Sequence, residues 1–229
     1  MFYGSEVIGL PEVSAILGVG PRRAATLMQA GKIQGRKLQS GAWITTPDAV
    51  DRYARSTRLG RGRMMTPATA WGVLWELSGL KPSWLPASTR SRVRAHIARS
   101  DAEGLIRADA GRTSIGYYEA GDADAARPGL ILTARAAAGT LRLLKSERYV
   151  INGYVRSGDL HAYAAECGMV TAIGGRHVLF ANTLPIEYAG SHMPKAVVAM
   201  DLARTTEGRS RAKAVIALER LREEWVQAQ

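Results

Sequence analysis

The sequence predicts a mixed α/β protein of the α+β type that is built from more than one module. Residues 10–53 show helical apolar spacing interrupted by Gly and Pro. Residues 129–180 carry short apolar segments of strand length between helical segments. The chain has 229 residues, 46% of them hydrophobic, which is enough for two or three folded modules.

Two short helices are predicted near the start of the chain. Residues 10–17 place their apolar side chains on one helical face, and the Gly-Val-Gly triplet at 18–20 ends that helix. A second helix is predicted over residues 21–30, with Pro21 at its first position. Its inward face carries Ala24, Leu27 and Met28. Its outward face carries Arg22, Arg23, Thr26 and Gln29.

A β-hairpin and a third helix follow. Residues 32–38 and 42–45 read as strands joined by a turn at 39–41, and Thr46-Pro47-Asp48 is a strong helix start. The order helix, turn, helix, hairpin, helix predicts a winged helix-turn-helix domain over residues 1–55. The polar side chains of the hairpin are Lys32, Arg36, Lys37, Gln39 and Ser40. Trp43 alternates with them, so we expect it to pack beneath the hairpin.

The middle of the chain is predicted to be a basic linker, residues 56–65, followed by a helical region, residues 66–120. Two roles are open for the linker cations Arg58, Arg61 and Arg63. They either contact DNA phosphates or are simply the solvated side chains of a flexible linker. A helix is predicted over residues 87–99, with Arg90, Arg92 and Arg94 spread over its outer surface. Its arginines form either a solvated face or a second DNA contact. With Leu105-Ile106 and residues 114–119, this region could complete a second small helix–wing module.

Residues 121–229 are predicted to form a mixed α/β domain for partner binding or oligomerisation. The expected strands are 129–133, 148–151, 169–173 and 176–180. Gly174-Gly175 predicts a two-residue hairpin between the last two strands. The expected helices are 136–145, 159–166 with Ser157 as its cap, 194–204 and 209–228, the last with an apolar stripe.

The charge of the chain is strongly positive and unevenly distributed. Lys and Arg number 31 against 20 Asp and Glu, a net charge of +11. Residues 1–63 hold ten cations and four anions (+6), residues 81–112 seven and three (+4), and residues 113–229 fourteen and twelve (+2), with Glu76 adding −1. Excess positive charge attracts polyanions, because binding phosphates releases condensed counterions. The expected polyanion partner is therefore bound by the first half of the chain.

Other functional classes find little support in the sequence. Cys167 is the only cysteine, the four histidines show no ligand spacing, and no nucleophile–base pair or carboxylate cluster is visible. We therefore expect no catalytic residues, no metal and no cofactor. No signal peptide or membrane span is recognisable, so a cytoplasmic, nucleoid-associated protein is expected. A ligand pocket in residues 121–229 stays open, and nothing in the sequence identifies its ligand.

The expected partner is double-stranded DNA. A helix that protrudes after a tight turn fits the major groove, where Arg and Gln side chains can bond guanine and adenine edges. Hairpin cations suit phosphate or minor-groove contacts. A single module makes a small DNA interface of about 600–1,000 Å². Tight binding then needs a homodimer on an inverted repeat, or a second basic module in the same chain.

The N-terminal residues resemble a known family of DNA-binding domains. Residues 10–19 (LPEVSAILGV), Leu27-Met28, 31–33 (GKI) and Trp43-Ile44 are similar to the excisionase/MerR-type winged helix, over about residues 8–54. Gly20-Pro21 departs from the family, which usually has a Ser or Thr N-cap there. This departure puts the start of the second helix in doubt by a residue or so.

The layout of the whole chain resembles a narrower group. A basic winged-helix head, an α/β body and the stretch PKAVVAMDL at 194–202 are similar to AbiE-like (type IV) antitoxin–repressors. That resemblance implies repression of the protein's own promoter and a nucleotidyltransferase-type toxin as partner. The alternative is an excisionase-like recombination or architectural protein, although such proteins are often little more than the head.

Overall fold

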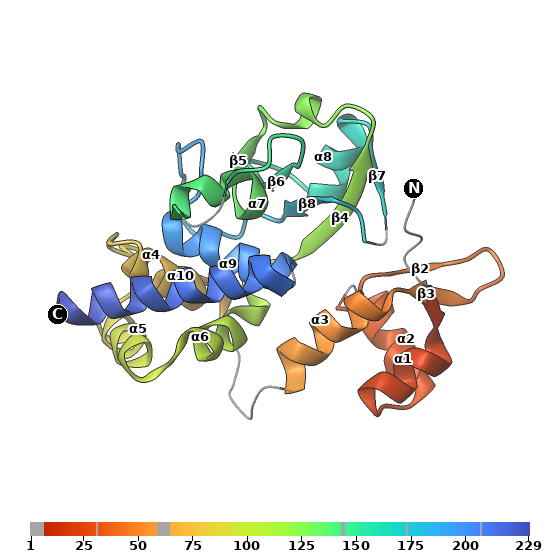
Figure 1. Cartoon of the computed structure of the whole chain (residues 1–229), viewed down its shortest axis with the longest axis horizontal. Coiled ribbons are helices and arrows are strands. Elements are labelled where there is room, and N and C mark those ends of the chain that lie inside the picture. Colours follow the sequence, from red (N-terminus) through yellow and green to blue (C-terminus); the bar gives the residue numbers. More distant parts are fainter. Residues whose placement is uncertain (1–6, 31, 59–64, 143–144, 173, 207) are drawn as a thin grey trace.

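A computed structural model describes residues 7–30, 32–58, 65–142, 145–172, 174–206 and 208–229, with the backbone alone at 48, 52 and 55–58. Helices take up 51% of the chain and strands 14%, so the predicted α+β class is confirmed. The chain folds into a small N-terminal head and a larger body, and each has its own hydrophobic core (Figure 1). No helix in the described ranges combines the length and apolarity needed to span a bilayer.

The head contains the predicted order of elements and one further strand. Its elements are β1 (Ile8–Gly9), α1 (Leu10–Leu17), α2 (Pro21–Gln29), β2 (Gly35–Lys37), β3 (Trp43–Thr45) and α3 (Pro47–Arg58). The strands form an antiparallel sheet in the order β1-β3-β2. Gly18 ends α1 in the left-handed region, at φ 65°, where glycine avoids the steric cost of a Cβ atom.

The head core lies between α1, α2, α3 and the sheet. Its fully buried members are Val13, Ala24, Leu27, Met28, Ile33, Ala49 and Val50. Trp43 packs against this cluster from β3, as expected. Helix α3 continues to Arg58, so the first three residues of the predicted linker are helical. The rest of that linker up to residue 64 lies outside the described residues.

The body surrounds a five-stranded sheet. Its helices are α4 (Pro67–Leu77), α5 (Ala87–Arg99), α6 (Ala102–Ala108), α7 (Ala134–Ala137), α8 (Leu160–Glu166), α9 (Lys195–Thr205) and α10 (Gly208–Gln227), with 3₁₀ turns η1 (Asp109–Gly111), η2 (Asp124–Ala126) and η3 (Ala138–Leu141). Its strands are β4 (Ile115–Ala120), β5 (Leu130–Leu132), β6 (Asn152–Val155), β7 (Met169–Thr171) and β8 (His177–Phe180). They run in the order β5-β6-β8-β4-β7, with only β6 and β8 parallel.

Residues 66–120 are not a second helix–wing module, contrary to one expectation from the sequence. Leu105 and Ile106 lie in helix α6, and β4 lies inside the five-stranded sheet between β8 and β7. Helices α4 and α5 contribute to the same core as the sheet and α9. The cause is long-range pairing: the partners of β4 lie 49 to 65 residues later in the chain.

Three local predictions in the body are wrong in detail. Gly174-Gly175 does not close a hairpin, because β4 lies between β7 and β8. Gly175 instead passes so close to β4 that a Cβ atom there would lie 2.5 Å from the Tyr118 carbonyl oxygen. The strand expected at 148–151 is Asn152–Val155. Helix α8 is capped by Asp159, not Ser157, through bonds from the His161 and Ala162 amides.

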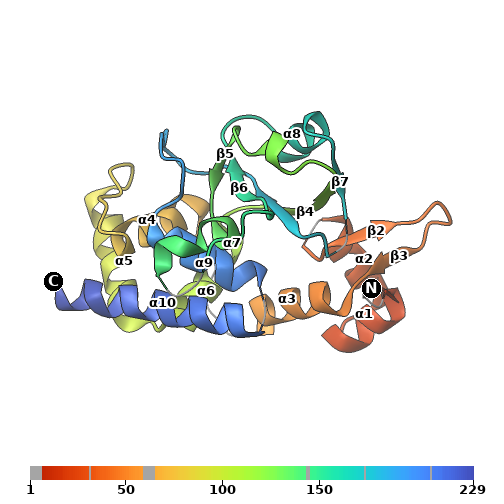
Figure 2. The ribbon, with the colours of Figure 1, turned by 45° about the horizontal axis from the view of Figure 1, so that its top comes forward.

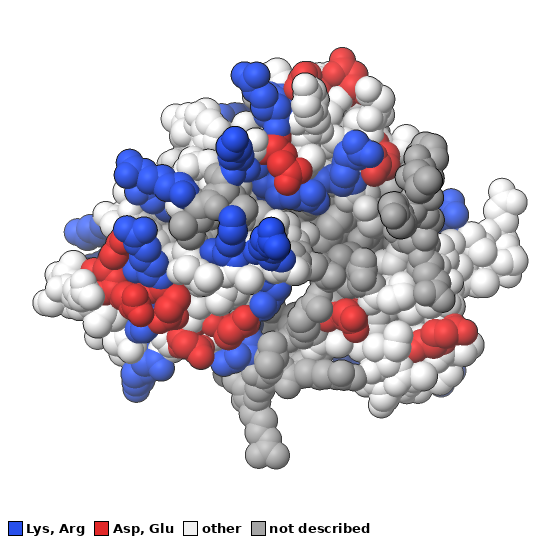
Figure 3. Space-filling model, viewed as in Figure 1, with Lys and Arg blue, Asp and Glu red and all other residues white. Residues whose placement is uncertain are grey.

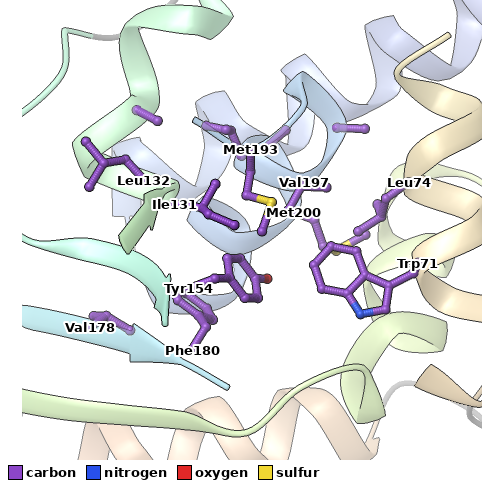
Figure 4. Packing of buried hydrophobic residues seen from close by; sticks show 14 of the residues in the cluster. Trp71, Leu74, Ile131, Leu132, Tyr154, Val178, Phe180, Met193, Val197 and Met200 are labelled. Atoms are coloured by element: carbon purple, nitrogen blue, oxygen red, sulfur yellow. The ribbon is translucent and has the colours of Figure 1, made fainter. Parts of the chain in front are cut away.

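Helix α9 is the centre of the body core. Nine of its eleven residues are buried, between the sheet on one side and helices α4 and α10 on the others (Figures 1 and 2). Figure 4 shows Val197 and Met200 of α9 facing Trp71 of α4 and Tyr154 of β6. The Tyr154 ring stacks on Phe180 with centroids 4.8 Å apart. The apolar stretch noted in the sequence is therefore a core helix.

A buried polar network crosses this core. The Arg112 side chain has no exposed surface, and its Nε and Nη2 donate to Asp109 (2.7 Å) and Asp201 (2.5 Å). Its Nη1 donates to the Tyr154 hydroxyl, which in turn donates to Asp201 Oδ2 at 2.9 Å. Burial raises the pKa of Tyr154 well above its ordinary value, so the phenol keeps the proton that it donates.

The network is balanced in charge. Thr133 donates to Asp201 Oδ2 at 2.6 Å, and Arg204 donates to Asp109 Oδ2 at 3.1 Å. Two carboxylates therefore face two guanidinium groups. The Arg112 guanidinium also lies 4.3 Å from the centre of the Trp71 ring. Removing one partner from such a set leaves an uncompensated buried charge, which costs more than the pair contributes.

We expect Arg112→Ala to lower the free energy of unfolding by about 3–5 kcal/mol, because Asp109 and Asp201 would stay buried without their cation. Urea unfolding followed by tryptophan fluorescence measures this loss. Arg220→Ala removes an exposed pair with Glu224 and should cost less than about 1 kcal/mol. Equal losses in the two variants would contradict a central role for the network.

Candidate nucleic-acid interface

Helix α2 presents the predicted polar face to solvent. Ala24, Leu27 and Met28 hold one side of the helix in the head core. The side chains of Arg22, Arg23, Thr26 and Gln29 are all exposed on the other side. The helix begins at Pro21, after Gly20 in extended conformation and without a side-chain cap. The start of α2 is therefore the predicted one despite the missing Ser or Thr.

One member of this face is partly engaged within the helix. The Thr26 hydroxyl donates to the Arg22 carbonyl oxygen at 2.9 Å. Its proton is therefore used locally, and its oxygen can still accept a hydrogen bond. Arg22, Arg23 and Gln29 make no side-chain hydrogen bond within the described part of the chain and keep all their donors for a partner.

The hairpin extends the polar surface beyond α2. Strands β2 and β3 are joined by a turn in which Leu38 and Ala42 pair and Gly41 has φ 85°. The side chains of Lys32, Arg36, Lys37, Gln39 and Ser40 are all exposed. In Figures 1 and 2 the hairpin projects away from the body. Such a projection can lie along a duplex beside a helix seated in the groove.

The cations of this surface have no carboxylate partners among the described residues. None of Arg22, Arg23, Lys32, Arg36 and Lys37 takes part in an ion pair there. The nearby Glu12 carboxylate instead accepts a hydrogen bond from the Gly9 amide. We name these nine residues the head surface: Arg22, Arg23, Thr26, Gln29, Lys32, Arg36, Lys37, Gln39 and Ser40.

The remaining predicted contacts are not joined to the head surface. Arg61 and Arg63 lie outside the described residues, as does the side chain of Arg58. Helix α5, which carries Arg90, Arg92 and Arg94, lies at the opposite end of the molecule from α1 and α2 (Figures 1 and 2).

Two of the three α5 arginines that were predicted to contact DNA instead make contacts within the body. Arg94 pairs with the buried Glu76 of α4 at 3.3 Å, and Arg90 donates to the Leu85 carbonyl oxygen at 2.6 Å. Arg92 is exposed and donates to the Thr89 hydroxyl. The positive charge of this region therefore contributes less to the surface than the sequence suggested, and Arg112 contributes nothing because it is buried.

A hydrogen bond that the sequence did not indicate connects the head to the body. Gln34, at the base of the hairpin, donates from Nε2 to the Ala172 carbonyl oxygen at 2.7 Å, just after β7. The Gln34 carbonyl oxygen in turn accepts a bond from the Thr45 hydroxyl. Figure 2 shows β2 beside this end of the sheet. In the sequence Gln34 lies between Ile33 and Gly35, and this context does not identify its partner.

The body has a hollow of about 410 Å³ where β4 ends and β8 begins. Glu119, Asp122, Asp124, Arg176 and His177 contribute to its lining, and the adjacent Tyr149 is 87% exposed. The lining carries three carboxylates against one guanidinium, which does not suit a phosphate backbone. In the described ranges no group of three or more His, Cys, Asp or Glu is arranged to hold a metal ion.

His177 is held neutral at the edge of this hollow. Its side chain is 2% exposed, and Nδ1 accepts a hydrogen bond from the Ile151 amide at 3.1 Å. Burial lowers the pKa of His177; Arg176 and Arg135 also lower it, whereas Glu119 raises it. The proton of the neutral ring therefore resides on Nε2.

No protein-family model matches the sequence, and no curated protein or solved structure is significantly similar to the chain. What the head surface can do follows from its own geometry: a helix whose solvent face carries arginine and glutamine side chains, followed by a projecting hairpin whose cations form no ion pair among the described residues.

We expect Gly35→Ala to loosen the hairpin. A Cβ atom there would lie 2.2 Å from Met28 Cε and 2.9 Å from the Ile44 carbonyl oxygen, and the backbone atom cannot swing away. Overpacking of this kind costs about 1–3 kcal/mol. Faster amide exchange in β2 and β3 is the expected result. Gly20→Ala is the control, since nothing lies within 4 Å of its Cβ position; equal exchange in both variants would contradict the packing argument.

We expect acidification below about pH 6.5 to destabilise the protein partly through His177. Because the folded-state pKa is depressed, the unfolded chain binds the proton first, and stability is lost as the pH falls towards the folded pKa. His177→Asn keeps an acceptor for the Ile151 amide but does not titrate. Urea unfolding at pH 7.5 and 5.5 should show a smaller loss in this variant, and an equal loss would exclude His177 as a contributor.

Proposed function

We propose that this protein is a sequence-specific DNA-binding transcriptional regulator whose head surface contacts the duplex. The observation that carries the proposal is the exposed, unpaired set of cations and amides on α2 and the adjoining hairpin. A helix has the width of the major groove, and the two arginines and Gln29 carry the donors that recognise guanine and adenine. The element order of the head supports a winged helix-turn-helix role for it.

In this proposal the two parts of the head surface have different tasks. Arg22, Arg23 and Gln29 on α2 bond base edges and supply sequence preference. Lys32, Arg36 and Lys37 neutralise phosphates and supply affinity that does not depend on sequence. A single module buries only about 600–1,000 Å² on DNA, so a homodimer would bind an inverted repeat with half-sites about one helical turn apart.

The antitoxin role adds a protein partner to the same DNA-binding activity. It rests on the resemblance in layout and on the apolar stretch that forms α9. Because α9 is buried, a toxin would have to contact other parts of the body. Co-purification with a nucleotidyltransferase encoded beside the gene would support this role. An excisionase-like protein would instead bend its DNA strongly, which circular-permutation gel shifts detect.

In vitro selection from random duplexes, followed by gel shifts of the selected site, tests the proposal. We expect Arg23→Ala to relax the preference at one base pair by about 1–3 kcal/mol, because a bidentate base contact is lost. Lys37→Ala should weaken binding to all sequences and reduce the salt slope by about 0.9, because one phosphate contact is lost.

Lys81→Ala is the control for loss of charge, since Lys81 is an exposed residue of the body between α4 and α5. It should bind like the wild type. If the wild type selects no sequence and binds selected and random duplexes equally, regulation by sequence-specific binding is wrong. If Lys37→Ala changes the preferred sequence and Arg23→Ala does not, the two tasks are assigned the wrong way round.

A further inference from the structure

The body carries a second group of cations on a face of its own. Two segments supply it: Arg142 and Lys145 between η3 and β6, and Arg209 and Lys213 in the first turns of α10. We call these four residues the basic band. Figure 3 shows several Lys and Arg side chains over this part of the body.

Packing brings these two distant segments together. Leu141 and Val215 both pack against the small core formed by Ala134, Ala138, Leu202, Ala203 and Ala214. Arg142 directly follows the first of these residues, and Lys213 lies two positions before the second. The Gly139 amide also donates to the Ser146 hydroxyl at 2.9 Å. This bond places Lys145, the residue before Ser146, near the start of η3.

Three of the four cations of the basic band, Arg142, Lys145 and Arg209, are available to a partner. Nearby ion pairs occupy other arginines, namely Arg135 with Glu147 and Arg211 with Glu103. Arg142, Lys145 and Arg209 form no ion pair with a carboxylate of the described residues, and Lys145 and Arg209 are exposed. Cations of like sign repel one another on a surface, and a chain of phosphates relieves that repulsion while releasing counterions.

We propose that the basic band binds the phosphate backbone of the DNA held by the head surface, outside the sequence that the head reads. This proposal rests on the proposed function. Arginine and lysine side chains bond phosphate oxygens, and such contacts carry no sequence information of their own. Because the head surface lies in the head and the band lies in the body, the DNA reaches the band only when it extends past the head (Figures 1 and 2). The contact therefore lengthens the footprint without adding sequence preference.

The test compares salt slopes on a short and a long duplex that carry the same selected site. The short duplex has about two helical turns, which is just enough for the inverted repeat, and the long one about four turns. Lys145→Gln/Arg209→Gln removes two charges from the band. On the long duplex it should reduce the slope of log affinity against log salt by about 1.8, because about 0.9 is lost per phosphate contact. On the short duplex it should bind like the wild type.

Lys81→Gln/Lys195→Gln is the matched control, because it removes two exposed lysines near the opposite end of α9. It should leave both slopes unchanged. Equal slopes for the band variant and the wild type on the long duplex would overturn the proposal, as would equal reductions in the band and control variants. Failure of the wild type to bind either duplex would overturn the proposed function itself, and this inference with it.

Discussion

The body depends on one buried guanidinium group. Arg112 connects three parts of the chain that are far apart in sequence: the turn after α6, strand β6 through Tyr154, and helix α9 through Asp201. A buried cation is tolerated only where it is paired and hydrogen-bonded, and here each guanidinium nitrogen donates to a carboxylate or a hydroxyl group. These segments can therefore adopt few other arrangements. The network thereby places α9 against the sheet. Helix α9 in turn packs against α7, η3 and α10.

The head follows a different physical rule. Its core is made of small and medium apolar side chains, and the charged side chains of α2 and the hairpin are left for solvent. Close approach of Gly35 to Met28 and Ile44 holds the hairpin against α2, so the two parts of the head surface keep a fixed relation. Rigid placement matters for recognition, because base contacts require side chains to meet groove edges in one register. The Gln34–Ala172 bond extends this order to the body.

Charge distinguishes the surfaces that hold the fold together from those that can bind. Some arginines form ion pairs with carboxylates within the body, namely Arg94, Arg112, Arg204 and Arg211. The head surface and three of the four cations of the basic band have no such partners among the described residues. Residues 113–229 hold fourteen cations and twelve anions, close to neutrality, yet Figure 3 shows several Lys and Arg side chains of the body on the face in view. Net charge by segment therefore does not show where exposed positive charge lies on the body.

The sequence by itself determined the local structure of the head. The apolar spacing of residues 10–30, the breaks at 18–20 and the turn before Trp43 specify the head, because each signal spans only a few residues. It also determined which side chains of α2 face solvent. Tertiary structure alone decided that β4 separates β7 from β8, that Arg112 is buried, and that Leu141 and Val215 pack against the same small core. These features depend on contacts between segments far apart in the chain, for which the periodicity of either segment carries no information.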